Sequence, residues 1–179
     1  DAPAPRYRQV TIGHPQVEVV EEGGILHMRS LEALLPRPER LLDRLLHWAQ
    51  VTPEQTFIAA RDTSGEWRRI SYAQMLADVR AIAQSLLAYG LSAERPLAIL
   101  SGNDIEQLQM ALGAMYAGIP YCPVSPAYSL LSQDFAKLRH VCDLLQPGLI
   151  FVSDAAIYQR AIEAVLPGDT PLVAVHGEL

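Results

Sequence analysis

Two polar stretches stand where an open α/β sheet would bind a ligand. Ser101 and Asn103 follow the apolar run 97–100 and precede a helical pattern, and residues 125–129 follow the next apolar run. Ligands of such sheets bind beyond the carboxyl ends of the strands, where helix starts offer free N–H donors. We therefore select Ser101, Asn103 and Tyr128 as candidate substrate-binding residues. Their competing interpretations are structural: Asn103 suits a helix N-cap and Tyr128 a packing aromatic.

The sequence contains no complete catalytic set. A phosphate loop needs a lysine at the mouth of a helix after a glycine-rich turn, whereas Lys137, the only lysine, stands within a helical pattern without a nearby glycine. The glycine-rich dinucleotide fingerprint and the Gly-x-Ser-x-Gly elbow are also absent. The histidines, Cys122 and Cys142 lack metal-ligand spacing. We expect no catalytic residue, metal site or cofactor site within this chain.

Composition excludes several classes of partner. The 179 residues carry 14 basic and 20 acidic side chains, a formal net charge of −6, without a Lys/Arg cluster. Nucleic acids and anionic membranes are therefore not expected as partners, because binding to them neutralises phosphates. The longest uncharged stretch, 107–133, contains prolines that would break a membrane-spanning helix. With no signal-peptide pattern and only two cysteines, a cytoplasmic location is expected.

The first fifty residues are interpreted as a lead-in to a larger unit. Residues 17–20 and 25–28 flank a glycine pair, which predicts a hairpin, and residues 38–48 repeat apolar side chains at helical spacing. We assign residues 1–50 to this lead-in of hairpin plus helix. Residues 51–179 are assigned to a truncated α/β subdomain.

The α/β pattern begins with a second hairpin and a long helix. Runs 57–61 and 67–70 are joined by turn-forming residues, and the helix after them starts at Ser71 and ends near Gly90. Strands are then predicted at 97–100, 121–124, 149–152 and 172–175. The spacing between these strands exceeds the dozen or so residues that a crossover helix needs. The fold class is therefore α/β, an open, mainly parallel sheet with helices on both faces.

The helices between these strands have recognisable starts and apolar stripes. Asn103 is expected to cap the first, with Glu106 three residues on. One continuous helix is expected to carry an apolar stripe that includes Leu131 and Phe135, and a later helix to turn Ile157, Ala161 and Val165 inward. Pro123 places its strand at a bulge or sheet margin, because proline has no N–H to donate. The pattern thus predicts where each helix begins and which of its side chains face the core.

Several segments resemble the amino-terminal part of adenylate-forming acyl-CoA synthetases. Residues 69–75 resemble the family's first core motif, in which a Ser/Thr-Tyr pair opens a long helix, and residues 114–124 resemble the second. Residues 46–49, 99–106 and 123–130 are similar to the feruloyl-CoA synthetase branch, whose substrates are hydroxycinnamic acids. The resemblance covers roughly Leu41 to Val175.

The resemblance implies a ligase that joins a small carboxylic acid to CoA. In such enzymes the acid attacks the α-phosphate of ATP, which yields an acyl-adenylate and pyrophosphate, and the CoA thiolate then displaces AMP. ATP, Mg²⁺ and CoA are therefore the implied cofactors of the whole enzyme. The family's phosphate loop, its acidic residues and its mobile-domain lysine have no counterpart in this sequence. The chain is expected to be an inactive fragment whose main partner is the remainder of its own polypeptide, a second α/β subdomain and a mobile carboxy-terminal domain.

Two other interpretations stay open on the sequence. A free-standing flavodoxin-like binding or receiver module would need an acidic cluster at the strand ends, where Asp104 and Asp154 stand singly. A purely structural scaffold half would assemble through a helical face. If a missing half normally covers this one, apolar side chains around Leu108, Met110 and Leu112 should be uncovered and should favour a homodimer.

Overall fold

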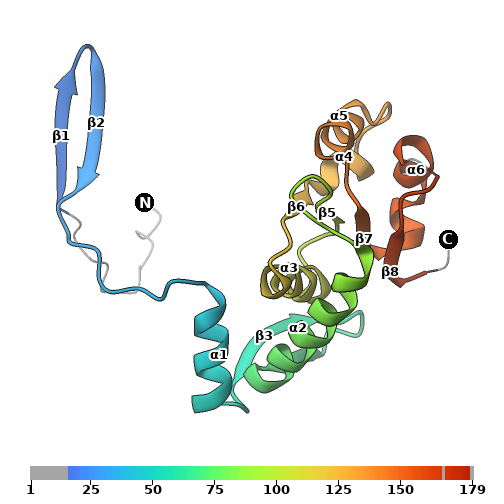
Figure 1. The fold of residues 1–179 in the computed structure, drawn as a ribbon, viewed down its shortest axis with the longest axis horizontal. Coiled ribbons are helices and arrows are strands. Elements are labelled where there is room, and N and C mark those ends of the chain that lie inside the picture. Colours follow the sequence, from blue (N-terminus) through green and yellow to red (C-terminus); the bar gives the residue numbers. More distant parts are fainter. Residues whose placement is uncertain (1–15, 167, 178–179) are drawn as a thin grey trace, which may run out of the picture. The chain divides into compact units, whose positions relative to one another are not determined.

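The computed structural model describes residues 16–166 and 168–177 (Figure 1). The chain divides into two compact units, Asp1–Pro38 and Glu39–Leu179. Helix α1, Leu42–Val51, therefore belongs to the second unit. The assignment of 1–50 and 51–179 as separate domains stays a prediction.

The first unit contains the predicted glycine-turned hairpin. Strands β1, Val17–Glu22, and β2, Ile25–Ser30, pair antiparallel, with Val19 opposite Met28. Gly23 and Gly24 both have positive φ, 60° and 80°, which is the backbone geometry that a two-residue hairpin turn demands. Residues 17–20 and 25–28 thus form the hairpin expected from the sequence.

The second unit opens with α1, a second hairpin and a long helix. Strands β3, Thr56–Arg61, and β4, Trp67–Ser71, pair antiparallel. The Ser71 hydroxyl then caps α2, Tyr72–Leu86, by accepting from the Gln74 N–H at 3.2 Å. A short 3-10 turn, Leu87–Tyr89, ends this segment at Gly90. Hairpin and helix agree with their predicted positions.

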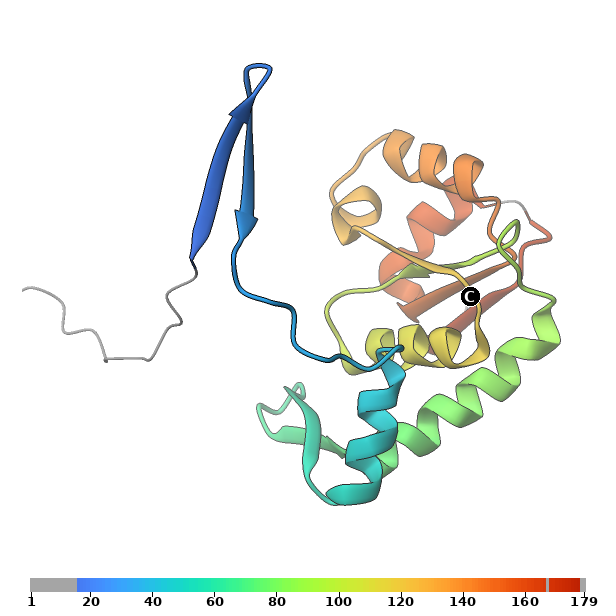
Figure 2. The same cartoon turned by 60° about the vertical axis from the view of Figure 1, so that its left-hand side comes forward.

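A four-stranded parallel sheet forms the centre of this unit, so the predicted fold class is confirmed (Figures 1 and 2). The strand order is β6-β5-β7-β8, and the strands are β5 (Leu97–Leu100), β6 (Tyr121–Val124), β7 (Leu149–Asp154) and β8 (Leu172–His176). The connecting helices are α3 (Ile105–Ala117), α4 (Pro126–Leu130), α5 (Ala136–Leu145) and α6 (Ala155–Val165). Pro123 lies in the edge strand β6, which confirms its expected place at the sheet margin.

Alternate residues of the central strands face two different apolar cores. Leu97 and Ile99 pack with side chains of α2 and α3, whereas Ala98 and Leu100 pack with those of α5 and α6. Successive side chains of a strand point to opposite faces, so a strand covered on both faces carries an unbroken apolar run. A third core joins α1, α2 and α3 around Met75.

Some helical expectations were wrong. The single helix expected after β6 is divided into α4 and α5, and Leu131 between them is 77% exposed. Phe135 adopts a positive φ of 54° at this break, where the Ser132 hydroxyl accepts its N–H. The Asp134 carboxylate accepts the Ala136 N–H at the start of α5, and this bond holds the pKa of Asp134 below its usual range. Local side-chain capping therefore interrupts the helix after Leu131, whereas the predicted apolar stripe continues through the buried residues Phe135, Leu138 and Cys142.

One side chain that was predicted to face inward from α6 is exposed instead. Ile157 is 59% exposed, and its neighbour Tyr158 is buried in the core of α5 and α6. Asp154 starts the helix, with its carboxylate accepting from the Ala156 and Ile157 N–H groups. The tertiary contacts of α6 thus turn Tyr158 inward in place of Ile157, whereas the predicted inward positions of Ala161, which is 1% exposed, and of Val165, which packs against the same core, are confirmed.

The expectation of an uncovered face on α3 was wrong. Met110 and Leu112 are only 8% and 5% exposed, and Leu108 is partly buried. Helix α2 packs directly on α3, because Gly113 lets the Ile82 side chain approach its backbone. The chain itself therefore covers the surface around these residues.

The α2–α3 contact generates a stability prediction. Gly113→Ala should destabilise the second unit by ~1–3 kcal/mol, because the added Cβ would lie 2.9 Å from the Ile82 Cβ. Alanine ordinarily stabilises a helix interior relative to glycine, so a destabilising effect of Gly113→Ala would show that the contact with Ile82 outweighs helix propensity. Urea unfolding of the single variant, of Ile82→Ala and of the double variant measures the coupling. Additive losses in this cycle would show that the two positions do not clash.

Candidate functional site

An open cavity lies at the carboxyl ends of β5 and β6. Because the two strands are parallel, the loops that leave them meet at the same edge of the sheet. The cavity measures about 460 Å³ and is lined by Ser101, Gly102, Asn103, Gln107, Pro123, Val124, Ser125 and Pro126. None of these described lining residues has a charged side chain. The site offers hydroxyl, carboxamide and backbone groups to a ligand.

The Ser101 hydroxyl and the start of α3 are held by one carboxylate. Ser101 is buried and donates from Oγ to Asp104 Oδ2 at 2.6 Å, while Asp104 Oδ1 accepts the Gln107 N–H at 2.7 Å. Asp104 has the extended backbone of an N-cap residue, φ −121° and ψ 171°. The expected N-cap at Asn103 was therefore wrong by one position.

This change of cap alters what the neighbouring residues do. Asn103 is exposed and lines the cavity beside Ser101. Glu106, expected in a capping box, instead forms an ion pair with Arg68 of β4. Gln107 also lines the cavity, although it was not predicted as a site residue. Its spacing of four residues from Asn103, about one helical turn, is the sequence feature that indicates this position.

Tyr128 lies outside this cavity. It is half-buried on α4, packs against the core of α5 and α6, and lines a separate cavity of about 340 Å³. The Lys137 ammonium lies 5.5 Å from the centroid of its ring. The structure therefore brings Ser101 and Asn103 together and places Tyr128 elsewhere. A role in substrate binding stays a prediction for all three.

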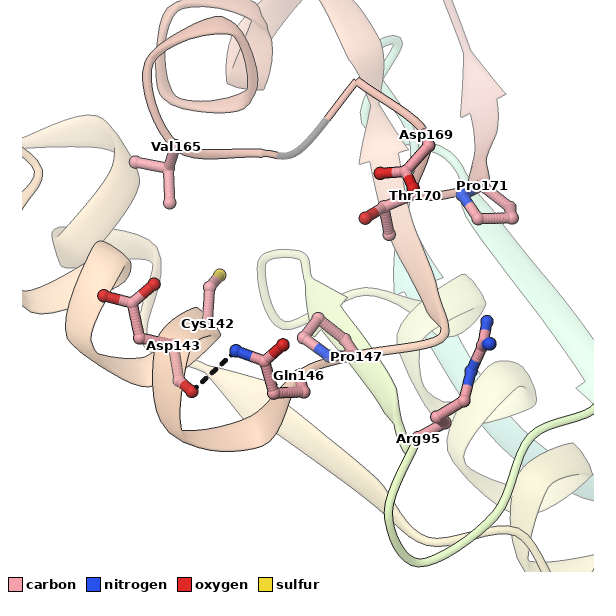
Figure 3. A pocket seen from close by; sticks show the side chains of 9 residues that line it. All are labelled: Arg95, Cys142, Asp143, Gln146, Pro147, Val165, Asp169, Thr170 and Pro171. Atoms are coloured by element: carbon pink, nitrogen blue, oxygen red, sulfur yellow. Dashed lines mark hydrogen bonds between the residues drawn. The ribbon is translucent and has the colours of Figure 1, made fainter.

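A further cavity of about 370 Å³ lies near the amino ends of the strands (Figure 3). Its lining includes Arg95, just before β5, and Cys142, Asp143 and Gln146 near the end of α5. The Gln146 side chain donates to the Asp143 carbonyl at 2.9 Å. Burial raises the pKa of the Cys142 thiol, so this cysteine is a poor nucleophile at neutral pH. The geometry does not indicate catalysis here.

Within 16–166 and 168–177, no three His, Cys, Asp or Glu side chains gather as a metal site. No helix in this part of the chain has the length and hydropathy needed to cross a bilayer.

Most of the second unit is similar in sequence to a known enzyme family. Residues 45–176 match the family model of the AMP-binding enzyme. The chain belongs to the AMP-binding enzyme family. The sequence resemblance to adenylate-forming enzymes is confirmed at this level, whereas the feruloyl-CoA synthetase branch is not shown.

Curated relatives of this AMP-binding chain include two much longer proteins. It is 28% identical over 104 residues to tyrocidine synthase 2 of Brevibacillus parabrevis, a match that covers 58% of the chain. It is 29% identical over 93 residues to a mycosubtilin synthase polypeptide of Bacillus subtilis, covering 52% of the chain. Each match spans only 3% of the relative's own length.

Solved structures with the same fold include acyl-adenylate enzymes. A fatty acyl-adenylate ligase from L. pneumophila, in complex with acyl adenylate and pyrophosphate, has a TM-score of 0.60 at 20% identity, covering 75% of this chain and 23% of that one. O-succinylbenzoate coenzyme A synthetase from Bacillus subtilis has a TM-score of 0.53 at 16% identity, covering 73% and 30%. At these identities the likeness shows the fold, and the AMP-binding chain spans a minor part of each protein.

The cap of α3 leads to a prediction about the wall of the cavity. Asp104→Ala should lower the free energy of unfolding by about 1 kcal/mol, because the Gln107 N–H and the Ser101 hydroxyl both lose their acceptor. Asn103→Ala, one residue away and exposed, should change it by less than about 0.5 kcal/mol. Urea unfolding of both variants compares them directly. A larger loss of unfolding free energy for Asn103→Ala than for Asp104→Ala would show that Asn103 is the N-cap residue.

The two cysteines provide a second, chemical prediction. In the folded chain at pH 8, iodoacetamide should label half-buried Cys122 faster than Cys142. Burial both shields the Cys142 sulfur and raises its pKa, so less of the reactive thiolate is present at that pH. Peptide mapping by mass spectrometry measures both rates, and unfolding in urea should bring them together. Faster native labelling of Cys142 would contradict the buried position of its thiol.

Proposed function

We propose that this chain is part of the adenylation domain of an ATP-dependent acid:CoA ligase. The match of residues 45–176 to AMP-binding enzymes carries the proposal. The proposed reaction of the whole enzyme joins a carboxylate to AMP with release of pyrophosphate, and the CoA thiol then displaces AMP. Its acid is ferulate or a related aryl or acyl acid, supported by the similarity of residues 46–49, 99–106 and 123–130 to the feruloyl-CoA synthetase branch.

The cavity beyond β5 and β6 does not by itself fit Mg²⁺ and ATP. Phosphoryl chemistry requires cations or N–H donors around the phosphate charge, together with oxygen ligands for the metal. The lining contains neither arginine nor lysine, and the nearby Asp104 carboxylate already accepts bonds from Ser101 and Gln107. We therefore assign no chemical step to these side chains. Ser101 and Asn103 belong to a polar, uncharged wall of the proposed active site.

The proposed chemistry thus depends on groups that the remainder of the polypeptide supplies, a second α/β subdomain and a mobile carboxy-terminal domain. The small part of each similar ligase that the chain spans, 23% of the length of the L. pneumophila enzyme, supports this proposal. The alternative of a free-standing flavodoxin-like module has no support from the family match.

A second candidate function has its own observation. The curated relatives are named as tyrocidine and mycosubtilin synthases, and we propose as the second candidate that this chain serves in the activation of an amino acid by a peptide synthetase. That reaction shares the adenylate step with the CoA ligase. The two functions differ in the acid and in the final thiol acceptor.

Pyrophosphate exchange distinguishes these functions. The full-length gene product with ATP and Mg²⁺ should show exchange that depends on ferulate, and addition of CoA should then yield feruloyl-CoA, identified by mass spectrometry. The 179-residue chain alone should show no exchange, because its cavity lining carries no cationic group for the phosphates.

Panels of proteinogenic amino acids and of aliphatic acids serve as matched controls in the same assay. Pyrophosphate exchange with amino acids, and none with ferulate, would contradict the CoA-ligase proposal and support the peptide-synthetase candidate. Exchange by the isolated chain would contradict our location of the catalytic groups.

A further inference from the structure

An exposed cluster of arginine and tryptophan lies on the outer face of the β3–β4 hairpin. Arg61 is the cross-strand partner of Trp67, and Arg69 lies two residues further along β4, on the same face as Trp67. The guanidinium carbons of Arg61 and Arg69 lie 4.6 Å and 5.8 Å from the Trp67 ring centroid. Trp67 is 49% exposed and both arginines are exposed. We call these three residues the RWR patch.

The inner face of the same hairpin is already used for folding. Ile58 and Ile70 pack against the core around Met75, and Arg68 pairs with Glu106 of α3. The hairpin lies beside α1 and α2, away from α5 and α6 (Figure 2). Stability of the second unit therefore explains the inner face and does not require an arginine and a tryptophan on the outer one.

The RWR patch carries cations without acidic partners. Among the described residues, no carboxylate lies within ion-pair distance of Arg61 or Arg69. Arg61 donates to the Gly65 carbonyl at 2.6 Å, which leaves its other N–H groups available. The nearby Asp62 carboxylate instead accepts from Ser64 and Glu66. Stacking on an indole orients a guanidinium and leaves its in-plane N–H donors open to a carboxylate.

We propose that the RWR patch binds an extended, acidic segment of a partner protein that presents two carboxylates on alternate residues. Arg61 and Arg69 are diagonal neighbours in the hairpin, about 7–8 Å apart at their backbones. Alternate residues of an extended strand lie about 6.6 Å apart, close to the spacing of the two arginine backbones, so one strand can present a carboxylate to each arginine. Trp67 between them supplies apolar contact, and tryptophan and arginine are the residues that dominate binding energy at protein interfaces.

The same geometry disfavours a nucleotide at this patch. A nucleobase would stack on an indole face, yet the Arg61 guanidinium already lies over the Trp67 ring at 4.6 Å. An extended carboxylate-bearing strand uses both cations at once.

Fluorescence anisotropy tests the proposal on the 179-residue chain. The probe is a fluorescein-labelled peptide of alternating glutamate and threonine, and its control replaces every glutamate with glutamine. The glutamate peptide should bind, and added salt should weaken its binding. Arg69→Glu should raise Kd by roughly tenfold or more, and Trp67→Ala should also raise it. Arg160→Glu, the same charge change at an exposed position of α6, should leave Kd within about twofold.

Further arms keep the test decisive if a variant folds poorly. Circular dichroism melts report folding, and Arg69→Lys, which keeps the charge, should bind better than Arg69→Gln. Equal binding of the glutamine peptide, or equal losses for Arg69→Glu and Arg160→Glu, would overturn the proposal. Competition by ADP or inorganic phosphate that depends on Arg69, without binding of the peptide, would reassign the patch to a phosphate ligand. Self-association that Arg69→Glu abolishes, without binding of the peptide, would reassign it to a second copy of this chain.

Discussion

Two-sided burial of a parallel sheet is the constraint on which this structure depends. The central strands β5 and β7 lose nearly all contact with solvent along residues 97–100 and 149–152. Each strand must therefore be covered by helices on both faces, and the crossovers place α3 on one face and α5 and α6 on the other. With both faces closed, the loops that leave the carboxyl ends of the strands are where a parallel sheet can meet a ligand.

The candidate site follows from that constraint. The loop after β5 must turn directly into α3, and Asp104 makes the turn by accepting bonds from Ser101 and Gln107. This arrangement orders the wall of the cavity and engages both oxygens of the Asp104 carboxylate in hydrogen bonds. The chain belongs to the AMP-binding enzyme family, and we propose that this polar, uncharged wall supports chemistry performed by groups outside it.

Helix α2 links this sheet to the hairpin outside it. One part of α2 packs with Leu97 and Ile99 of β5, and another forms the core around Met75 with β3 and β4. Each strand of the hairpin consequently has a packed face and an open face. The open face takes no part in the packing of the sheet, and it carries the RWR patch that we propose binds a partner.

The sequence by itself determined both hairpins, the four strands and the edge position of Pro123, because hydrophobic runs and turn formers act locally. Only the tertiary structure decided that Asp104 rather than Asn103 caps α3, since Ser101 must also find an acceptor when it is buried. Contacts between distant segments likewise placed Tyr128 outside the cavity, turned Tyr158 inward and covered Met110 with α2. A local pattern specifies which elements form, whereas the phase of a helix and the neighbours of a side chain depend on packing across the whole unit.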